Sequence, residues 1–268
     1  MTRRLIAVLA VACCSVMLDV HPARAQQTVN LSIGRFMVRG ADARVEGDVL
    51  NANRNFLTFD VDEFNTWSVG GEWLFPVGNY IEGGAGIAFT RKTVPTVYTN
   101  LVNANGSEIE QELRLRTVPM AFTFRVLPLG QHTGFQPYLG GGVSLINWRY
   151  AETGQFVDPR DNSIFNDSSA ETGTAAGPVA LGGIRFAGDA IASGFEIRYQ
   201  KADADLPAPF AGTKIDLGGW SYLFTIGARL GEFCVRPCRR FDSPARELWC
   251  SCFFDFCLGG ILLMSAVP

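Results

Sequence analysis

Residues 66–75 read TWSVGGEWLF, and this stretch decides the fold class. Large apolar side chains occupy alternate positions, at Trp67, Val69, Trp73 and Phe75. The positions between them, up to Glu72, carry small or polar residues. Alternation with a period of two predicts a β-strand with one apolar and one polar face.

The same alternation recurs along the chain, and we count eight such segments. They are 28–38, 64–76, 79–91, 109–128, 134–149, 173–187, 190–202 and 216–231. After the N-terminal segment, no apolar run is long enough for a transmembrane helix. The sequence therefore predicts an all-β protein of eight antiparallel strands.

Two segments change the phase of their alternation. In one, Leu115 has the opposite parity to Phe122, and Pro119 lies between them. In the other, the parity changes across Gly182-Gly183. Proline or glycine inside a strand commonly marks a β-bulge, so we expect a bulge at both places.

The connections between the segments alternate in length. Three are short and lie around 76–79, 130–133 and 188–189. Four are long and polar, at 39–63, 92–108, 150–172 and 203–215. Outer-membrane barrels combine short periplasmic turns with long external loops. An exported N-terminus starts in the periplasm, which makes the first, long connection external. The pattern predicts an up-and-down transmembrane β-barrel.

The composition agrees with a body whose outer surface is not in water. Charged residues make up 18% of the 268-residue chain, whereas about 25% is usual for soluble domains. Only three lysines occur, Lys92, Lys201 and Lys214. The net charge of −3 argues against a nucleic-acid partner.

The two ends of the chain differ from its body. Residues 1–25 are predicted to be a secretory signal peptide, with Arg3 and Arg4 before an apolar run and an A-x-A site at 23–25. Residues 26–233 form the predicted barrel and contain no cysteine. The tail 234–268 holds five cysteines without a histidine or the pairing of common zinc sites. We interpret that tail as a non-native extension.

The polar face is expected to line the lumen because its charges are Glu and Arg in near balance and buried charges must be paired. The predicted lumen network is Glu72, Glu82, Glu112, Arg114, Arg116, Arg125, Glu196, Arg198 and Arg229. Such pairs would plug a narrow barrel; a gate that breaks and re-forms the pairs is the alternative. Aromatic residues near strand ends predict membrane girdles. They are Trp67, Phe89, Tyr199, Trp220 and Tyr222 at the external rim, and Trp73, Phe75, Phe135 and Phe186 at the periplasmic rim.

The signal peptide, the eight strands, the stretch YLGGGV at 138–143 and the closing segment 220–230 together resemble the small outer-membrane β-barrel families around OmpW and the OmpA membrane domain. The resemblance covers residues 26–233. It implies location in the bacterial outer membrane, contact with its lipid and lipopolysaccharide, and insertion by the barrel assembly machinery. In such families the closing strand ends the domain at an aromatic residue, whereas this chain continues.

A search for catalytic chemistry finds little. The predicted mature chain has a single histidine, His132, in a short periplasmic turn. Triad and general-base catalysis usually need a histidine at the site, so we expect no enzyme, no metal site and no cofactor. The leading hypothesis is a non-enzymatic outer-membrane protein that acts in envelope integrity or surface interaction. The alternatives are a narrow OmpW-like channel and a soluble, lipocalin-like periplasmic barrel.

Overall fold

The computed structural model describes residues 27–158 and 160–230. The predicted signal peptide and the cysteine-rich tail lie outside these residues and stay predictions. Eight strands dominate the described part. They are β1 (Gln27–Val38), β3 (Thr66–Pro76), β4 (Ile81–Val102), β5 (Glu108–Val126), β6 (Phe135–Val157), β7 (Ile164–Ala187), β8 (Ile191–Gln200) and β11 (Gly219–Leu230). Within the described residues, no helix is both long and apolar enough to cross a membrane.

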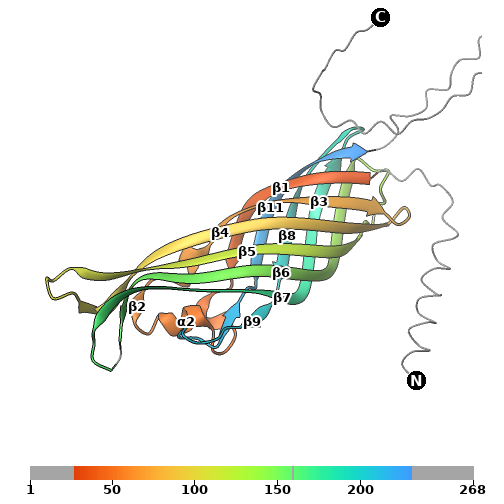
Figure 1. The fold of residues 1–268 in the computed structure, drawn as a ribbon. Helices are drawn as coiled ribbons and strands as arrows, with labels where there is room; N and C mark the ends of the chain where they lie inside the picture. Colours follow the sequence, from red (N-terminus) through yellow and green to blue (C-terminus); the bar gives the residue numbers. More distant parts are fainter. Residues whose placement is uncertain (1–26, 159, 231–268) are drawn as a thin grey trace, which may run out of the picture. The chain divides into compact units, whose positions relative to one another are not determined.

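The eight strands close into a ring of antiparallel neighbours (Figure 1). Each strand pairs with the next one of the ring, and β1 closes it by pairing with β11 from Gln27↔Leu230 to Val38↔Gly219. Closure satisfies the backbone hydrogen bonds of both terminal strands, which a membrane requires. The predicted eight-stranded antiparallel barrel is confirmed.

The two ends of the barrel are built differently. The short turns 77–80, 127–134 and 188–190 share one end with Gln27 and Leu230. By the rule for outer-membrane barrels this is the periplasmic end. The longer connections lie at the opposite, external end, as predicted.

Two of the predicted long loops are mostly strand. Residues 92–102 continue β4, and most of 150–172 continues β6 and β7, so that of the described residues only 103–107, 158 and 160–163 lie outside the strands. Figure 1 shows β4 to β7 running on past the ends of the other strands. The prediction of loops was wrong because these stretches are polar. Their polarity belongs to a sheet whose outer face is in water and does not indicate loop structure. We call the extensions 91–102, 108–116, 147–157 and 164–177 the outer wall.

The other two long connections, 39–65 and 201–218, fold into short elements, and we call them together the external cap. The first contains η1 (Ala41–Ala43), α2 (Val49–Asn53), β2 (Leu57–Thr58) and η2 (Val61–Phe64). The second contains β9 (Asp203–Asp205) and β10 (Lys214–Asp216), which pair with each other. Asp48 begins α2 as its N-cap, because its carboxylate accepts hydrogen bonds from the backbone N–H groups of Leu50 and Asn51.

Neither predicted bulge exists. Pairing of β5 with β6 keeps one register from Gln111↔Gly154 to Val126↔Leu139, straight through Pro119. β7 likewise pairs without a shift on both sides of Gly182-Gly183. The side chains keep their parity throughout. On β5 the environment of each face changes, because the inward side chains are apolar at the external end, as at Leu115, and charged within the belt, as at Arg125. On β7 the apolar Leu181 points inward at the level of the belt, where it is buried with Leu127 and Tyr138.

Candidate functional site

The exterior of the barrel is covered by exposed apolar side chains, which we call the apolar belt. Its members include Leu31, Ile33, Val69, Trp73, Ile87, Phe89, Met120, Phe122, Phe124, Leu139, Val143, Leu145, Ile184, Phe186, Phe195, Ile197, Phe224 and Ile226. Leu139 is 71% exposed and Phe124 is 65% exposed. Continuous apolar patches beyond roughly a few hundred Å² are rare on soluble monomers, so this surface requires lipid around it. A lipocalin-like barrel would hold these side chains inside.

The belt has the height of a membrane. Its outward apolar residues run from Val118 to Val126 on β5 and from Phe135 to Leu145 on β6. With about 3.3 Å rise per residue and a strand tilt of about 40°, roughly ten residues cross the apolar band of about 25 Å. The observed lengths match this span.

The predicted girdle residues all lie on ring strands. Eight of the nine are exposed, at Trp67, Trp73, Phe75, Phe89, Phe135, Phe186, Trp220 and Tyr222. The ninth, Tyr199, is partly covered because its ring lies 4.7 Å from that of Trp220. Phe135 and Phe186 form a second pair, at 5.5 Å. Their role as membrane-interface anchors stays a prediction.

Inside the belt, four charged side chains form what we call the lumen cluster: Glu72 of β3, Arg125 of β5, and Glu196 and Arg198 of β8. Arg125 Nη2 pairs with Glu72 and lies 2.8 Å from Glu196 Oε2. Arg198 Nη2 lies 2.6 Å from Glu196 Oε1 and 3.5 Å from Glu72 Oε1. Because β3, β5 and β8 are not neighbours in the ring, the contacts between Glu72, Arg125 and the two β8 residues cross the lumen.

Neutral groups complete the lumen cluster. The Tyr138 hydroxyl donates to Glu196 at 3.0 Å, and the Thr123 hydroxyl donates to Glu72 at 3.3 Å. The Arg125 guanidinium lies 4.9 Å from the centre of the Tyr138 ring. Two carboxylates balance two guanidinium groups, so the cluster closes the lumen without net charge.

A second ion pair lies nearer the periplasmic end. Arg185 of β7 binds Glu82 of β4 through two hydrogen bonds of 3.0 and 3.1 Å. Arg185 Nε also donates to Gln136 at 2.7 Å. Sequence reasoning missed Arg185, although its alternation with Ile184 and Phe186 would have placed it inside. Arg229, which was predicted in the lumen, is partly buried there and donates to the Gly188 carbonyl at 2.8 Å.

Three residues of the predicted lumen network lie outside the barrel, and that part of the prediction is wrong. Glu112, Arg114 and Arg116 share the outward parity of Phe122, because β5 has no bulge at Pro119. The side chains of Glu112 and Arg114 are 56% and 46% exposed and pair at 3.5 Å. They belong to the outer wall, where the exterior is in water.

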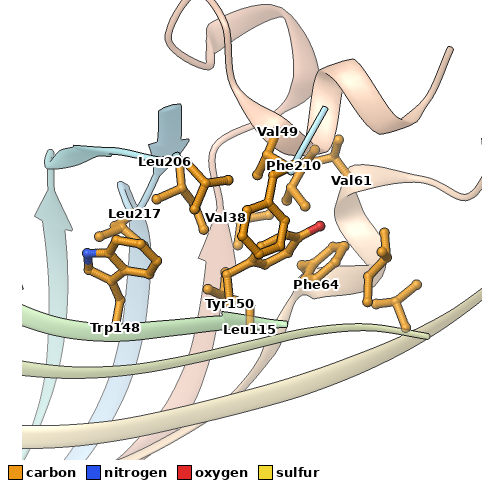
Figure 2. Packing of buried hydrophobic residues seen from close by; sticks show 14 of the residues in the cluster. Val38, Val49, Val61, Phe64, Leu115, Trp148, Tyr150, Leu206, Phe210 and Leu217 are labelled. Atoms are coloured by element: carbon orange, nitrogen blue, oxygen red, sulfur yellow. The ribbon is translucent and has the colours of Figure 1, made fainter. Parts of the chain in front are cut away.

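Above the lumen cluster, the external cap closes the barrel with an apolar core. Trp148 and Tyr150 of β6 and Leu115 of β5 point inward from the outer wall (Figure 2). Val49 of α2 and Phe210 of the second cap connection meet them, and the rings of Tyr150 and Phe210 lie 5.5 Å apart. Several of these side chains are fully buried, so the external mouth of the lumen is filled.

Buried ion pairs join the two connections of the external cap. Arg44 binds the Asp48 carboxylate at 2.5 Å, and Asp48 accepts the backbone N–H of Asp216 at 2.8 Å. Asp216 in turn binds Arg39 at 2.8 Å and accepts from the Val45 backbone N–H at 3.1 Å. Sequence reasoning missed these residues because their partners are up to 177 positions apart.

A buried carboxylate attaches the external cap to the outer wall. Glu152, above the apolar belt on β6, accepts hydrogen bonds from Asn53 at 2.7 Å and from Tyr150 at 2.8 Å. Gln111 contributes a longer one at 3.4 Å. Burial raises the pKa of the Glu152 carboxyl above its usual value, and the three hydrogen bonds oppose that rise only in part.

Comparison with solved structures finds small outer-membrane barrels. The outer membrane protein OprG of Pseudomonas aeruginosa is 14% identical, with 78% of this chain and 95% of that chain covered and a TM-score of 0.43. Neisserial surface protein A is 9% identical, with 77% and 99% covered and a TM-score of 0.39. The N-terminal β-barrel domain of Pseudomonas aeruginosa OprF is 8% identical, with 76% and 97% covered and a TM-score of 0.36.

No protein-family model matches the chain, and no curated protein matches it in sequence. The closed ring of eight strands and the lipid-facing apolar belt are observed in the chain itself. They make it a transmembrane β-barrel of the outer-membrane type.

Proposed function

We propose that this chain is a non-enzymatic, non-conducting outer-membrane protein that presents its outer wall for contacts at the cell surface. The observation that carries the proposal is that the lumen is closed twice in series. The lumen cluster crosses it within the membrane, and the external cap fills it above the membrane. A channel would have to open both closures at once.

The outer wall supports a role in surface contact. Four strands continue past the apolar belt and end in the turns 103–107 and 158–163. Residues 164–177 of β7 have no paired strand on the side away from β6 among the described residues, since β8 pairs only from Val179 onward and the Pro178 carbonyl accepts the Lys201 backbone N–H. Unpaired strand edges are sites where extended segments of other proteins attach.

The position of His132 favours a role without catalysis. This histidine is exposed in the turn 127–134 at the periplasmic end. Within the described residues, no three His, Cys, Asp or Glu side chains lie close enough together to hold a metal ion. The buried carboxylates of the lumen cluster are paired with arginine, which keeps them unavailable as general bases.

Planar-bilayer recordings test the non-conducting part of the proposal. The full chain should give no steady conductance, and removal of the two cap segments 41–63 and 203–215 should leave it closed because the lumen cluster remains. The same deletions combined with Arg125→Ala and Arg198→Ala should open a pore. Steady, ion-selective conductance of the unaltered chain would instead establish the narrow-channel alternative.

Epitope insertion tests the surface part. A tag between Asn105 and Gly106, at the tip of the β4–β5 hairpin, should bind antibody on intact cells. A matched tag between Gly78 and Asn79, in a short turn, should bind only after the outer membrane is opened. Labelling of the second tag on intact cells would mean that the barrel has the opposite orientation and that the outer wall does not face the cell exterior.

A further inference from the structure

Three arginines lie side by side on the exterior, directly above the apolar belt. We call Arg91 of β4, Arg116 of β5 and Arg149 of β6 the arginine row. On β4 the last belt residue is Phe89, and Arg91 is the next outward position. On β5 Arg116 likewise follows Val118. The arginine row therefore begins where the hydrocarbon of the outer leaflet ends.

The strand register places these arginines opposite one another. Arg91 pairs with Arg116 across β4 and β5, and Arg116 pairs with Arg149 across β5 and β6. Directly opposed side chains have Cβ atoms about 5 Å apart, and like charges at that spacing destabilise a sheet. Three adjacent guanidinium groups in this arrangement call for an anion between them.

The chain does not supply that anion. Among the described residues, no carboxylate forms an ion pair with Arg91, Arg116 or Arg149, and Arg116 Nε is buried without a hydrogen-bond partner. An ion pair on the same outward face, Glu112 with Arg114, is exposed and 3.5 Å long. The arginine row and Arg114 line a hollow of about 250 Å³ whose other walls are the small residues Ala151, Thr153, Ser168 and Ala170.

We infer that the arginine row, with Arg114, binds the phosphate groups of lipopolysaccharide in the outer leaflet. Guanidinium groups bind phosphate through paired, charge-assisted hydrogen bonds. Lipopolysaccharide is a phosphorylated glycolipid, so its acyl chains would lie against the apolar belt and its phosphates at the level of Arg91 and Arg116. Thr153 and Ser168 offer hydroxyls to the sugar. The inference rests on the proposed orientation in the outer membrane.

Lipopolysaccharide binding to the folded full-length barrel in phosphatidylcholine vesicles tests this assignment, with purified lipopolysaccharide as the probe. The variant Arg91→Gln/Arg116→Gln/Arg149→Gln should bind about a hundredfold more weakly, since each arginine near a charged lipid surface contributes about fivefold. The matched control is Arg54→Gln/Arg160→Gln/Lys201→Gln, which removes the same charge from exposed external positions and should bind as the unaltered chain does. Arg116→Gln alone provides a milder variant should the triple change impair folding.

Two further probes identify the ligand chemistry. Dephosphorylated lipopolysaccharide should bind the unaltered chain as weakly as the triple variant binds the intact lipid. Inorganic phosphate should fail to compete at equal molar concentration. Equal binding by the triple variant and its control, or equal binding of the dephosphorylated lipid, would overturn the assignment, and competition by inorganic phosphate would replace the lipid with a free anion. Heat-modifiable gel mobility of the unaltered chain reports insertion separately, so a failed barrel is distinguished from a failed lipid site.

Discussion

The same strands carry apolar side chains on their outer face within the membrane and on their inner face above it. On the membrane part of β5, Arg125 points inward and Phe124 points outward. Ten residues further toward the external end of the same strand, Leu115 is buried inside and Arg114 is exposed outside. The backbone register is identical in both regions. The difference lies only in which face meets water, because lipid surrounds one region and solvent the other.

This contrast explains how the barrel is held together at each level. Within the membrane, the interior holds the paired charges of the lumen cluster beside a few apolar side chains such as Leu181, and its stability depends on every buried charge having a partner. Above the membrane, the interior is an apolar core in which the outer wall and the external cap bury surface from water. Equivalent substitutions should therefore have opposite consequences in the two regions.

Arg125→Ala should be the most damaging change. It leaves Glu72 and Glu196 sharing Arg198 inside the barrel, and breaking a buried ion pair costs about 3–5 kcal/mol. Urea unfolding of the barrel in lipid vesicles measures the loss. Arg114→Ala, which breaks an exposed pair above the belt, should cost about 1 kcal/mol or less. Similar losses for the two variants would mean that the lumen cluster is solvated.

Phe122→Arg should rank second. Phe122 lies midway along the belt part of β5, where a charge facing lipid costs about 2–4 kcal/mol. The folded fraction after insertion into vesicles, read from the heat-modifiable gel shift, should fall. Glu110→Arg places the same side chain outward on the same strand above the belt and should insert normally. Equal insertion of both variants would mean that Phe122 does not face lipid.

Ile146→Val and Ile87→Val compare a buried position of the external core with a lipid-facing one. Ile146 is fully buried, so losing a methylene should cost about 0.5–1.5 kcal/mol. Ile87 is 54% exposed on the belt, and mobile lipid fills the space that its missing methylene leaves. Unfolding midpoints should fall for Ile146→Val only. A larger fall for Ile87→Val than for Ile146→Val would contradict a packed apolar core at the external end.

The smallest expected effect is a pH dependence of the external cap. Because the folded pKa of Glu152 is raised, the folded state holds its proton more tightly than the unfolded state. The cap should be most stable below the ordinary glutamate pKa of about 4.3, and lose stability as pH rises from there through the raised value. Hydrogen exchange in residues 41–63, corrected for intrinsic rates, should show this. Glu152→Gln should abolish the dependence, and its persistence there would assign the titration to another group.

The fold was largely predictable because a period of two is visible wherever one face is uniform. All eight strands were expected within a few residues at their periplasmic ends. The strands β4, β6 and β7 were predicted too short at their external ends, because in the outer wall both faces change character. Leu115 and Phe122 lie at positions of opposite parity on one regular strand, so Leu115 points inward and Phe122 points outward. The change of phase at Pro119 that suggested a bulge therefore marks the edge of the membrane.

The site was predictable only in part for the same reason. Glu72, Arg125, Glu196 and Arg198 lie within the membrane, where polar residues point inward, and the structure brings them together. Arg116 lies above the belt, where the rule reverses, and was therefore placed on the wrong face. The ion pairs of the external cap join loops that are far apart in the sequence, so no local sequence pattern predicts them.

Site-directed spin labelling along β5 tests the reversal most directly. Single labelled cysteines at 110–126, in a chain whose other cysteines are changed to serine, are compared for collision with oxygen, which concentrates in lipid, and with a water-soluble nickel complex. We expect oxygen access at even positions from 118 to 126 and nickel access at even positions from 110 to 116. Odd positions should be shielded from both throughout. Exposure of residues 113 and 115 with shielding of 114 and 116 would restore the bulge at Pro119 and contradict the account.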